Sequence, residues 1–137
     1  MNKPIPSQEE LAALLEPLDA APVECDGMAR LIATVLRHER IPFRVMVGSL
    51  AADGQGIAPH VWIEVGQWRI DYRARMWLRG LSDVPHGVFP LESGESTRYN
   101  GMEAEIEPLE PWMFKVLTMP QIAEMKHLPP EEEAHDF

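Results

Sequence analysis

The chain has 137 residues, of which 45% are hydrophobic and 25% are charged, which predicts one globular domain with a buried core. Its net charge of −10 disfavours nucleic acid and anionic membranes as partners, and residues 92–137 carry most of the excess, with 11 acidic side chains against 3 basic ones. No apolar run approaches the roughly 18 to 20 residues of a membrane span, no signal-peptide pattern occurs at residues 1–6, and the single cysteine cannot form an internal disulfide. We therefore expect a cytoplasmic protein.

The first element expected along the chain is a short helix over about residues 8–17. Ser7 and Glu10 have the spacing of a capping box, in which each side chain accepts a hydrogen bond from the backbone of the other residue. Apolar residues at helical spacing follow: Leu11, Leu14, Leu15 and Leu18. Pro17 and the Ala21-Pro22 pair should end this helix.

A second, longer helix is predicted from Cys25 to Glu39. Its apolar side chains repeat with the spacing of one buried helix face: Met28, Leu31, Ile32, Val35 and Leu36. The Ile41-Pro42 pair should end it. Cys25 falls in the first turn, where the positive end of the helix dipole favours the nucleophilic thiolate over the thiol.

Three strands are predicted next, over residues 43–48, 60–65 and 68–71. Residues 51–58 carry two glycines and are interpreted as a loop, whereas Gly66-Gln67 has the form of a tight hairpin turn. Adjacent strands that follow helices in the sequence predict an α+β domain with an antiparallel sheet.

The pattern weakens after this point, and residues 74–101 show little periodicity. A strand over residues 102–106 and short helices over 112–117 and 122–125 are expected. We predict a single domain over residues 1–128 and an acidic, flexible tail over residues 129–137.

Cys25, His60 and Asp71 together supply a nucleophile, a base and a carboxylate that could orient the base. They come from three successive elements, so they can converge in space. The same three residue types could also bind zinc, but no HExxH or CxxC spacing supports a metal site. No glycine-rich phosphate loop is present either, and we expect no metal and no cofactor.

The order and spacing of these residues resemble the transglutaminase-like superfamily, whose fold is related to that of papain-type cysteine peptidases. The resemblance covers residues 24–72. The matching residues are Cys25, Ala29, Leu36-Arg37, Ile41-Pro42-x-Arg44, Gly48, His60-Val61-Trp62-x-Glu64-Val65, Trp68 and Asp71. It implies a papain/transglutaminase-like core, in which a helix headed by the cysteine packs on a small antiparallel sheet.

The resemblance implies that Cys25 is the nucleophile, His60 the general base and acid, and Asp71 the group that orients His60. It implies a cysteine-dependent acyl-transfer enzyme that acts on amide or peptide bonds of a protein or peptide substrate through a thioester. A peptidase or amidase is the first expectation, and a leader-peptide peptidase of the lasso-peptide type is a narrower form of it. A transglutaminase or a non-catalytic binding module that kept the fold is the alternative.

Several further residues are candidates for roles around this triad. The backbone N–H of Cys25 suits an oxyanion donor, and Gln8 is the available side-chain donor upstream. Trp62, Arg73 and Arg75 are candidates for a substrate rim, although Trp62 could instead be a core or pocket-wall aromatic and the two arginines could pair with acidic side chains. The chain departs from the family pattern directly after Asp71, where a tyrosine replaces the usual proline.

Overall fold

The structure, a computed structural model, describes residues 5–52, 54–78, 84–92, 97–107 and 109–118. The helices are α1 (Gln8–Leu15), a 3-10 helix (Glu16–Ala20), α2 (Cys25–His38), α3 (Ala74–Trp77) and α4 (Pro111–Thr118). The strands are β1 (Arg44–Ala52), β2 (Gln55–Val65), β3 (Trp68–Asp71), β4 (Gly87–Pro90) and β5 (Thr97–Ala104).

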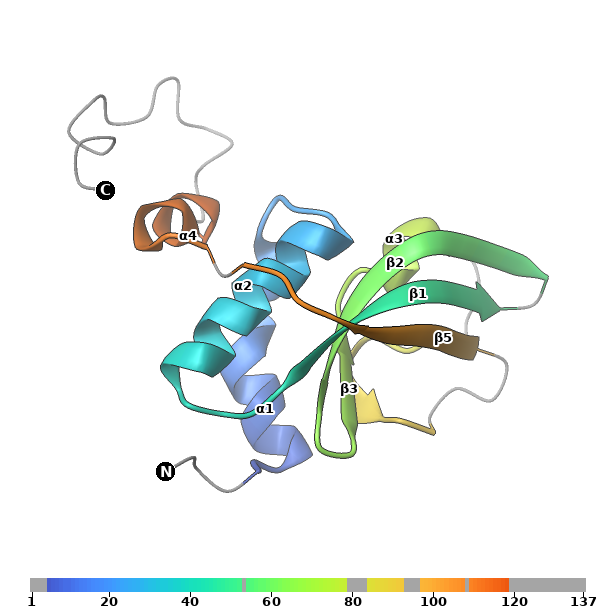
Figure 1. Ribbon diagram of the computed structural model, residues 1–137, viewed down its shortest axis with the longest axis horizontal. Helices are drawn as coiled ribbons and strands as arrows, with labels where there is room; N and C mark the ends of the chain where they lie inside the picture. Colours follow the sequence, from blue (N-terminus) through green and yellow to red (C-terminus); the bar gives the residue numbers. More distant parts are fainter. Residues whose placement is uncertain (1–4, 53, 79–83, 93–96, 108, 119–137) are drawn as a thin grey trace.

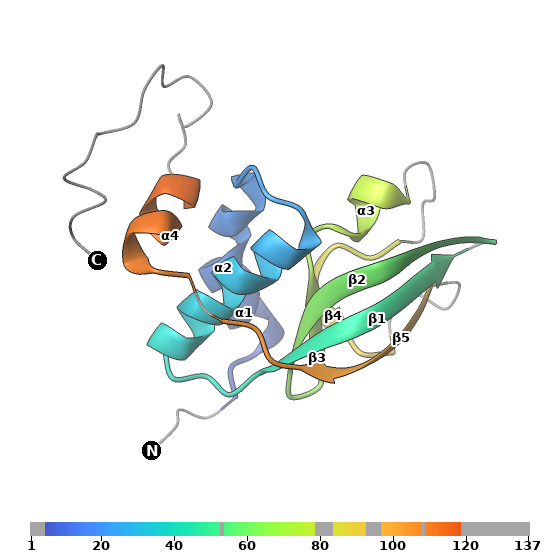
Figure 2. The same cartoon turned by 45° about the horizontal axis from the view of Figure 1, so that its top comes forward.

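The five strands form one antiparallel sheet in the order β4-β3-β2-β1-β5, which confirms the predicted α+β class. Figures 1 and 2 show α1 and α2 at one end of this sheet, while the β1–β2 hairpin extends away from them at the other end. Within the described part of the chain, no helix combines the length and apolar character needed to cross a bilayer.

The predicted capping box begins α1. Ser7 Oγ accepts a hydrogen bond from Glu10 N at 3.2 Å, and Glu10 Oε1 accepts one from Ser7 N at 2.9 Å. The α-helix ends at Leu15, two residues before its predicted end, because Pro17 lies in a following turn of 3-10 helix.

The predicted second helix is confirmed over nearly its whole length, and its end shows the geometry of a C-cap. Arg40 has a φ of 60°, and the N–H of Ile41 donates to Leu36 O at 2.9 Å. This left-handed position is usually occupied by glycine, since a side chain is strained there.

The loop predicted over residues 51–58 is wrong, because β1 and β2 continue as a long hairpin through most of it. Leu50 and Ala52 are buried in a small apolar cluster with Ala74, Leu78 and Val84. Alanine and glycine have weak β propensity, so the pattern was poor evidence for a strand, and packing decides the outcome.

The remaining predictions agree with the structure in part. The Gly66-Gln67 turn is confirmed, with a φ of 56° at Gly66, and the helix expected at 112–117 lies within α4. The strand expected at 102–106 is instead β5, which begins five residues earlier. The helix expected at 122–125 and the tail from 129 lie outside the described residues.

A larger core fills the space between the sheet and helices α1 and α2. Ile63 of β2 belongs to this larger core, whereas Ile57 of the same strand packs on the small cluster at the far end of the hairpin. His60 therefore lies on the stretch of β2 between the two cores, where the strand is anchored on both sides.

Candidate active site

His60 and Asp71 form a buried hydrogen-bonded pair. His60 lies on β2 and Asp71 ends the neighbouring strand β3, so the sheet itself brings them together. The distance from His60 Nε2 to Asp71 Oδ2 is 2.7 Å, and the two side chains are 0% and 1% exposed. The orienting contact expected from the sequence is therefore present.

The Asp71 carboxylate is held by donors on both of its oxygens. Oδ1 accepts hydrogen bonds from the backbone N–H groups of Arg73 at 2.9 Å and Ala74 at 3.0 Å. Oδ2 accepts one from the Tyr99 hydroxyl at 2.8 Å, in addition to its contact with His60. These donors offset the cost of burying a carboxylate and fix its orientation toward the imidazole.

Cys25 is the first residue of α2 and is half-buried. The preceding residue, Glu24, makes no side-chain hydrogen bond to the first turn of the helix. The N–H groups of that turn are therefore not capped by this side chain, and they remain suited to a developing negative charge.

The second ring nitrogen of His60, Nδ1, is buried and has no hydrogen-bond partner among the described residues. Although the Cys25 thiol does not meet hydrogen-bond geometry at Nδ1, it lies close enough to stabilise the charged ring. Burial lowers the pKa of His60, but the hydrogen bonds and charges of Asp71 and Cys25 outweigh it and raise the pKa from 6.5 to about 9. His60 is therefore an imidazolium near neutral pH.

No protein-family model, curated protein or solved structure matches the chain.

The raised pKa of His60 predicts a specific pH dependence of stability. Because the folded-state pKa of about 9 lies above the unfolded value of 6.5, protonation of His60 stabilises the fold fully below about pH 6.5. This contribution should be lost as the pH rises through about 9. Urea unfolding across this range should show wild-type stability falling more steeply than that of His60→Gln.

The same titration can be followed directly by NMR of the ring protons in protein labelled with 13C-histidine. The His60 signal, assigned by its loss in His60→Gln, should titrate near 9. Replacing Cys25 with alanine should move the midpoint downward, because one of the groups that stabilise the charged ring is removed. A wild-type midpoint at or below 6.5 would contradict the described geometry.

Arg73 lies inside the fold instead of on the substrate rim where we expected it. It is 6% exposed, and all five N–H donors of its guanidinium are used within the chain. The acceptors are Asp19 Oδ1, Asp19 O, Ala21 O, Val23 O and Tyr72 O, at 2.6 to 2.9 Å. No donor remains for a substrate, and Arg73 instead ties residues 19–23, which lead into Cys25, to the strand end that carries Asp71.

Trp62 lies in the core, which is one of its two expected places, and not at the substrate rim. It is 2% exposed, its ring stacks on His60 at 5.9 Å between centroids, and its Nε1 donates to Glu64 Oε2 at 3.1 Å. Glu64 is buried and pairs with Arg44 and Arg69, at 2.9 and 3.1 Å. These two residues therefore support His60 from within the protein.

The other two candidates lie near the surface. Arg75 is exposed and donates one hydrogen bond to Val84 O at 2.8 Å, so it remains available as a rim residue. Gln8 is half-buried, and its amide nitrogen donates to Val88 O on β4 at 2.7 Å. This contact fixes Gln8 to the edge of the sheet, and no described contact joins it to Cys25.

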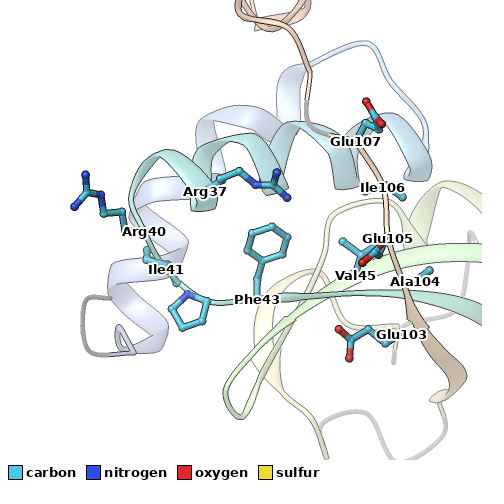
Figure 3. Close-up of a pocket in the computed structure, with 11 residues that line it drawn as sticks. Arg37, Arg40, Ile41, Phe43, Val45, Glu103, Ala104, Glu105, Ile106 and Glu107 are labelled. Atoms are coloured by element: carbon cyan, nitrogen blue, oxygen red, sulfur yellow. The ribbon is translucent and has the colours of Figure 1, made fainter. Parts of the chain in front are cut away.

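A large hollow in the described structure is separate from these residues. A cavity of about 990 Å³ lies at the C-terminal end of α2. Its lining includes Arg37, Arg40, Phe43, Glu103, Glu105 and Glu107 (Figure 3). Cys25 is at the other end of the helix, roughly 18 Å away at 1.5 Å per residue. Beside Cys25 itself, the space between α2 and the sheet is only about 10 Å³.

Within the described residues, no group of three or more histidine, cysteine, aspartate and glutamate side chains is arranged to hold a metal ion.

Sequence reasoning missed Tyr99 and the structural role of Arg73. Tyr99 falls in the stretch without periodicity, and no local signal distinguishes it from a surface tyrosine.

Proposed function

We propose that this protein is a cysteine-dependent acyl-transfer enzyme with Cys25, His60 and Asp71 as its triad. The observation that carries the proposal is the buried Nδ1 of His60. It has no hydrogen-bond partner among the described residues, while the opposite nitrogen is bound to Asp71. The Cys25 thiol interacts with the same ring, and it is the only thiol in the chain. A nucleophile, a base and an orienting carboxylate in this order are the requirements of nucleophilic catalysis.

The fold supports the same proposal. A helix that begins at the cysteine packs on an antiparallel sheet, and neighbouring strands carry the histidine and the aspartate. This is the arrangement expected for a papain/transglutaminase-like core. A free cysteine persists in a reducing compartment, so we propose a cytoplasmic enzyme.

The reaction begins from a Cys25 thiolate beside a protonated His60. The sulfur attacks the carbonyl carbon of an amide, and the carbonyl electrons move to oxygen, where the N–H of Cys25 is the proposed donor. The C–N bond then breaks, and the His60 proton passes to the departing amine. A thioester on Cys25 remains.

In the second half of the reaction, neutral His60 takes a proton from water as the water oxygen attacks the thioester. The C–S bond breaks, a carboxylic acid leaves, and the thiolate and the protonated ring are restored. With an amine in place of water, the same steps give transamidation. We propose a peptidase or amidase that acts on a protein or peptide, with transamidation as the alternative outcome.

The proposal is tested by the rate at which iodoacetamide alkylates Cys25 as a function of pH, followed by intact mass. Wild type should be labelled quickly below about pH 7, because protonated His60 stabilises the thiolate. Below about pH 7, Cys25 in His60→Ala should be alkylated at least about tenfold more slowly than in wild type. Near pH 9 the two rates should be similar.

His38→Ala is the matched control, since His38 is 85% exposed and its side chain pairs only with the neighbouring Glu39 in the described structure. It should label as wild type does. If wild type and His60→Ala instead share one titration near about pH 8.5, the proposed triad is not assembled, and the binding-module alternative becomes the better explanation.

A further inference from the structure

Tyr99 donates its hydroxyl to the oxygen of Asp71 that also binds His60. The distances to Asp71 Oδ2 are 2.8 Å from Tyr99 Oη and 2.7 Å from His60 Nε2. Two donors therefore share one carboxylate oxygen, and the strength of one contact depends on the other.

The tyrosine ring is held in place on several sides. It packs edge-on against Trp62 at 4.9 Å between centroids and lies 6.1 Å from the ring of Phe89. The guanidinium carbon of Arg69 lies 4.3 Å above the ring, a cation–π distance. Arg69 is itself held by two hydrogen bonds to Glu64. These contacts keep the Tyr99 ring in the orientation in which its hydroxyl reaches Asp71.

The hydroxyl also remains a donor over the whole working range of pH. Burial raises the pKa of Tyr99 far above its ordinary value, and the charge and hydrogen bond of Asp71 raise it further, against a smaller lowering by Arg69. Tyr99 thus contributes a neutral, permanent hydrogen bond to a charged carboxylate.

We propose that Tyr99 is a positioning residue that holds Asp71 and limits how strongly Asp71 stabilises the charged His60 ring. This deepens the proposed function and rests on it, since it assigns a fourth residue to the same site. The charged and titratable groups that interact with His60 are Asp71 from β3 and Cys25 from α2. Around Tyr99 they are Asp71, Arg69 and the His60 ring, which lies 6.5 Å away between centroids, and Arg69 is hydrogen-bonded to Glu64.

The test compares Tyr99→Phe with Tyr72→Phe by the NMR titration of His60. Tyr99→Phe keeps the ring contacts but removes one donor from Asp71 Oδ2, so the carboxylate should interact more strongly with the imidazolium. We expect the His60 midpoint to rise by about 0.5 unit or more. Tyr72→Phe is a matched control, because the Tyr72 hydroxyl is buried without a hydrogen-bond partner in the described structure. It should leave the midpoint unchanged.

A second measurement predicts a shift of the His60 midpoint in the opposite direction. It does not depend on whether Tyr99→Phe folds. The chain has two tyrosines, so Tyr72→Phe leaves Tyr99 as the single site for biosynthetic 3-fluorotyrosine. The fluorinated phenol is a stronger donor, and it should lower the His60 midpoint relative to unlabelled Tyr72→Phe.

These results separate the inference from the proposed function. If alkylation shows an assembled pair but neither change at Tyr99 moves the His60 midpoint, the role of Tyr99 is overturned while the enzyme proposal stands. If the midpoint moves in both directions as expected while Cys25 alkylates as an ordinary thiol, Tyr99 positions the His60–Asp71 pair and the acyl-transfer proposal fails.

Discussion

Arg73→Met should lower the free energy of unfolding by about 2 to 3 kcal/mol, which is less than the cost of breaking a fully buried ion pair because the Asp19 side chain is 35% exposed. Methionine has a similar length but no donors. Four backbone carbonyls and the Asp19 carboxylate would lose their shared partner. Two of the five contacts, to Tyr72 O and Ala21 O, are buried, and losing the donor to a buried acceptor is costly. Urea unfolding at neutral pH measures the change.

Arg75→Met is the matched control for this substitution. Arg75 is exposed and donates one hydrogen bond, to Val84 O, so its loss should cost less than about 1 kcal/mol. Arg73→Lys should remain well below wild type, because lysine has three donors and cannot match five acceptor contacts. Equal stability of Arg73→Met and Arg75→Met would show that the buried guanidinium does not hold this segment.

Replacing Arg73 should also affect the chemistry at Cys25. Arg73 joins residues 19–23 to the end of β3, and its backbone N–H binds Asp71. Its side chain therefore connects the segment before the nucleophile to the group that orients the base. In the folded fraction of Arg73→Lys, Cys25 alkylation below about pH 7 should be slower than in wild type.

Gly48→Ala should lower the free energy of unfolding by about 3 kcal/mol, at the upper end of the cost of overpacking. Gly48 on β1 lies opposite His60 on one side and Gly101 of β5 on the other. An added Cβ would collide with the backbone oxygen of Asn100, which cannot move without shifting β5. Urea unfolding would report the loss, and the His60 titration would report the disturbance of Tyr99.

Gly56→Ala is the control within the same hairpin. A Cβ there would meet its nearest atom, Leu50 O, at an ordinary contact distance of 3.5 Å. Its effect should stay within about 0.5 kcal/mol, since no backbone has to move. If Gly48→Ala is as stable as Gly56→Ala, the close approach of β5 to β1 is not required for folding.

The sequence by itself determined the local elements of this protein and the chain order of its candidate triad. The capping box at Ser7, the helical apolar pattern after Cys25 and the Gly66 turn depend on residues a few positions apart, so they can be interpreted without the fold. The same holds for the ends of the strands that carry His60 and Asp71, although β2 begins at Gln55, five residues before its predicted start.

Only the tertiary structure decided what surrounds the triad. In the sequence, Arg73 resembles a surface cation. In the structure it donates to the backbone carbonyls of Val23 and Ala21, about 50 residues away along the chain. Backbone carbonyls carry no sequence signal. Tyr99 reaches Asp71 because two facing glycines, Gly48 and Gly101, let β5 approach β1 closely. Such contacts depend on pairing and packing between distant segments, and local periodicity does not encode them.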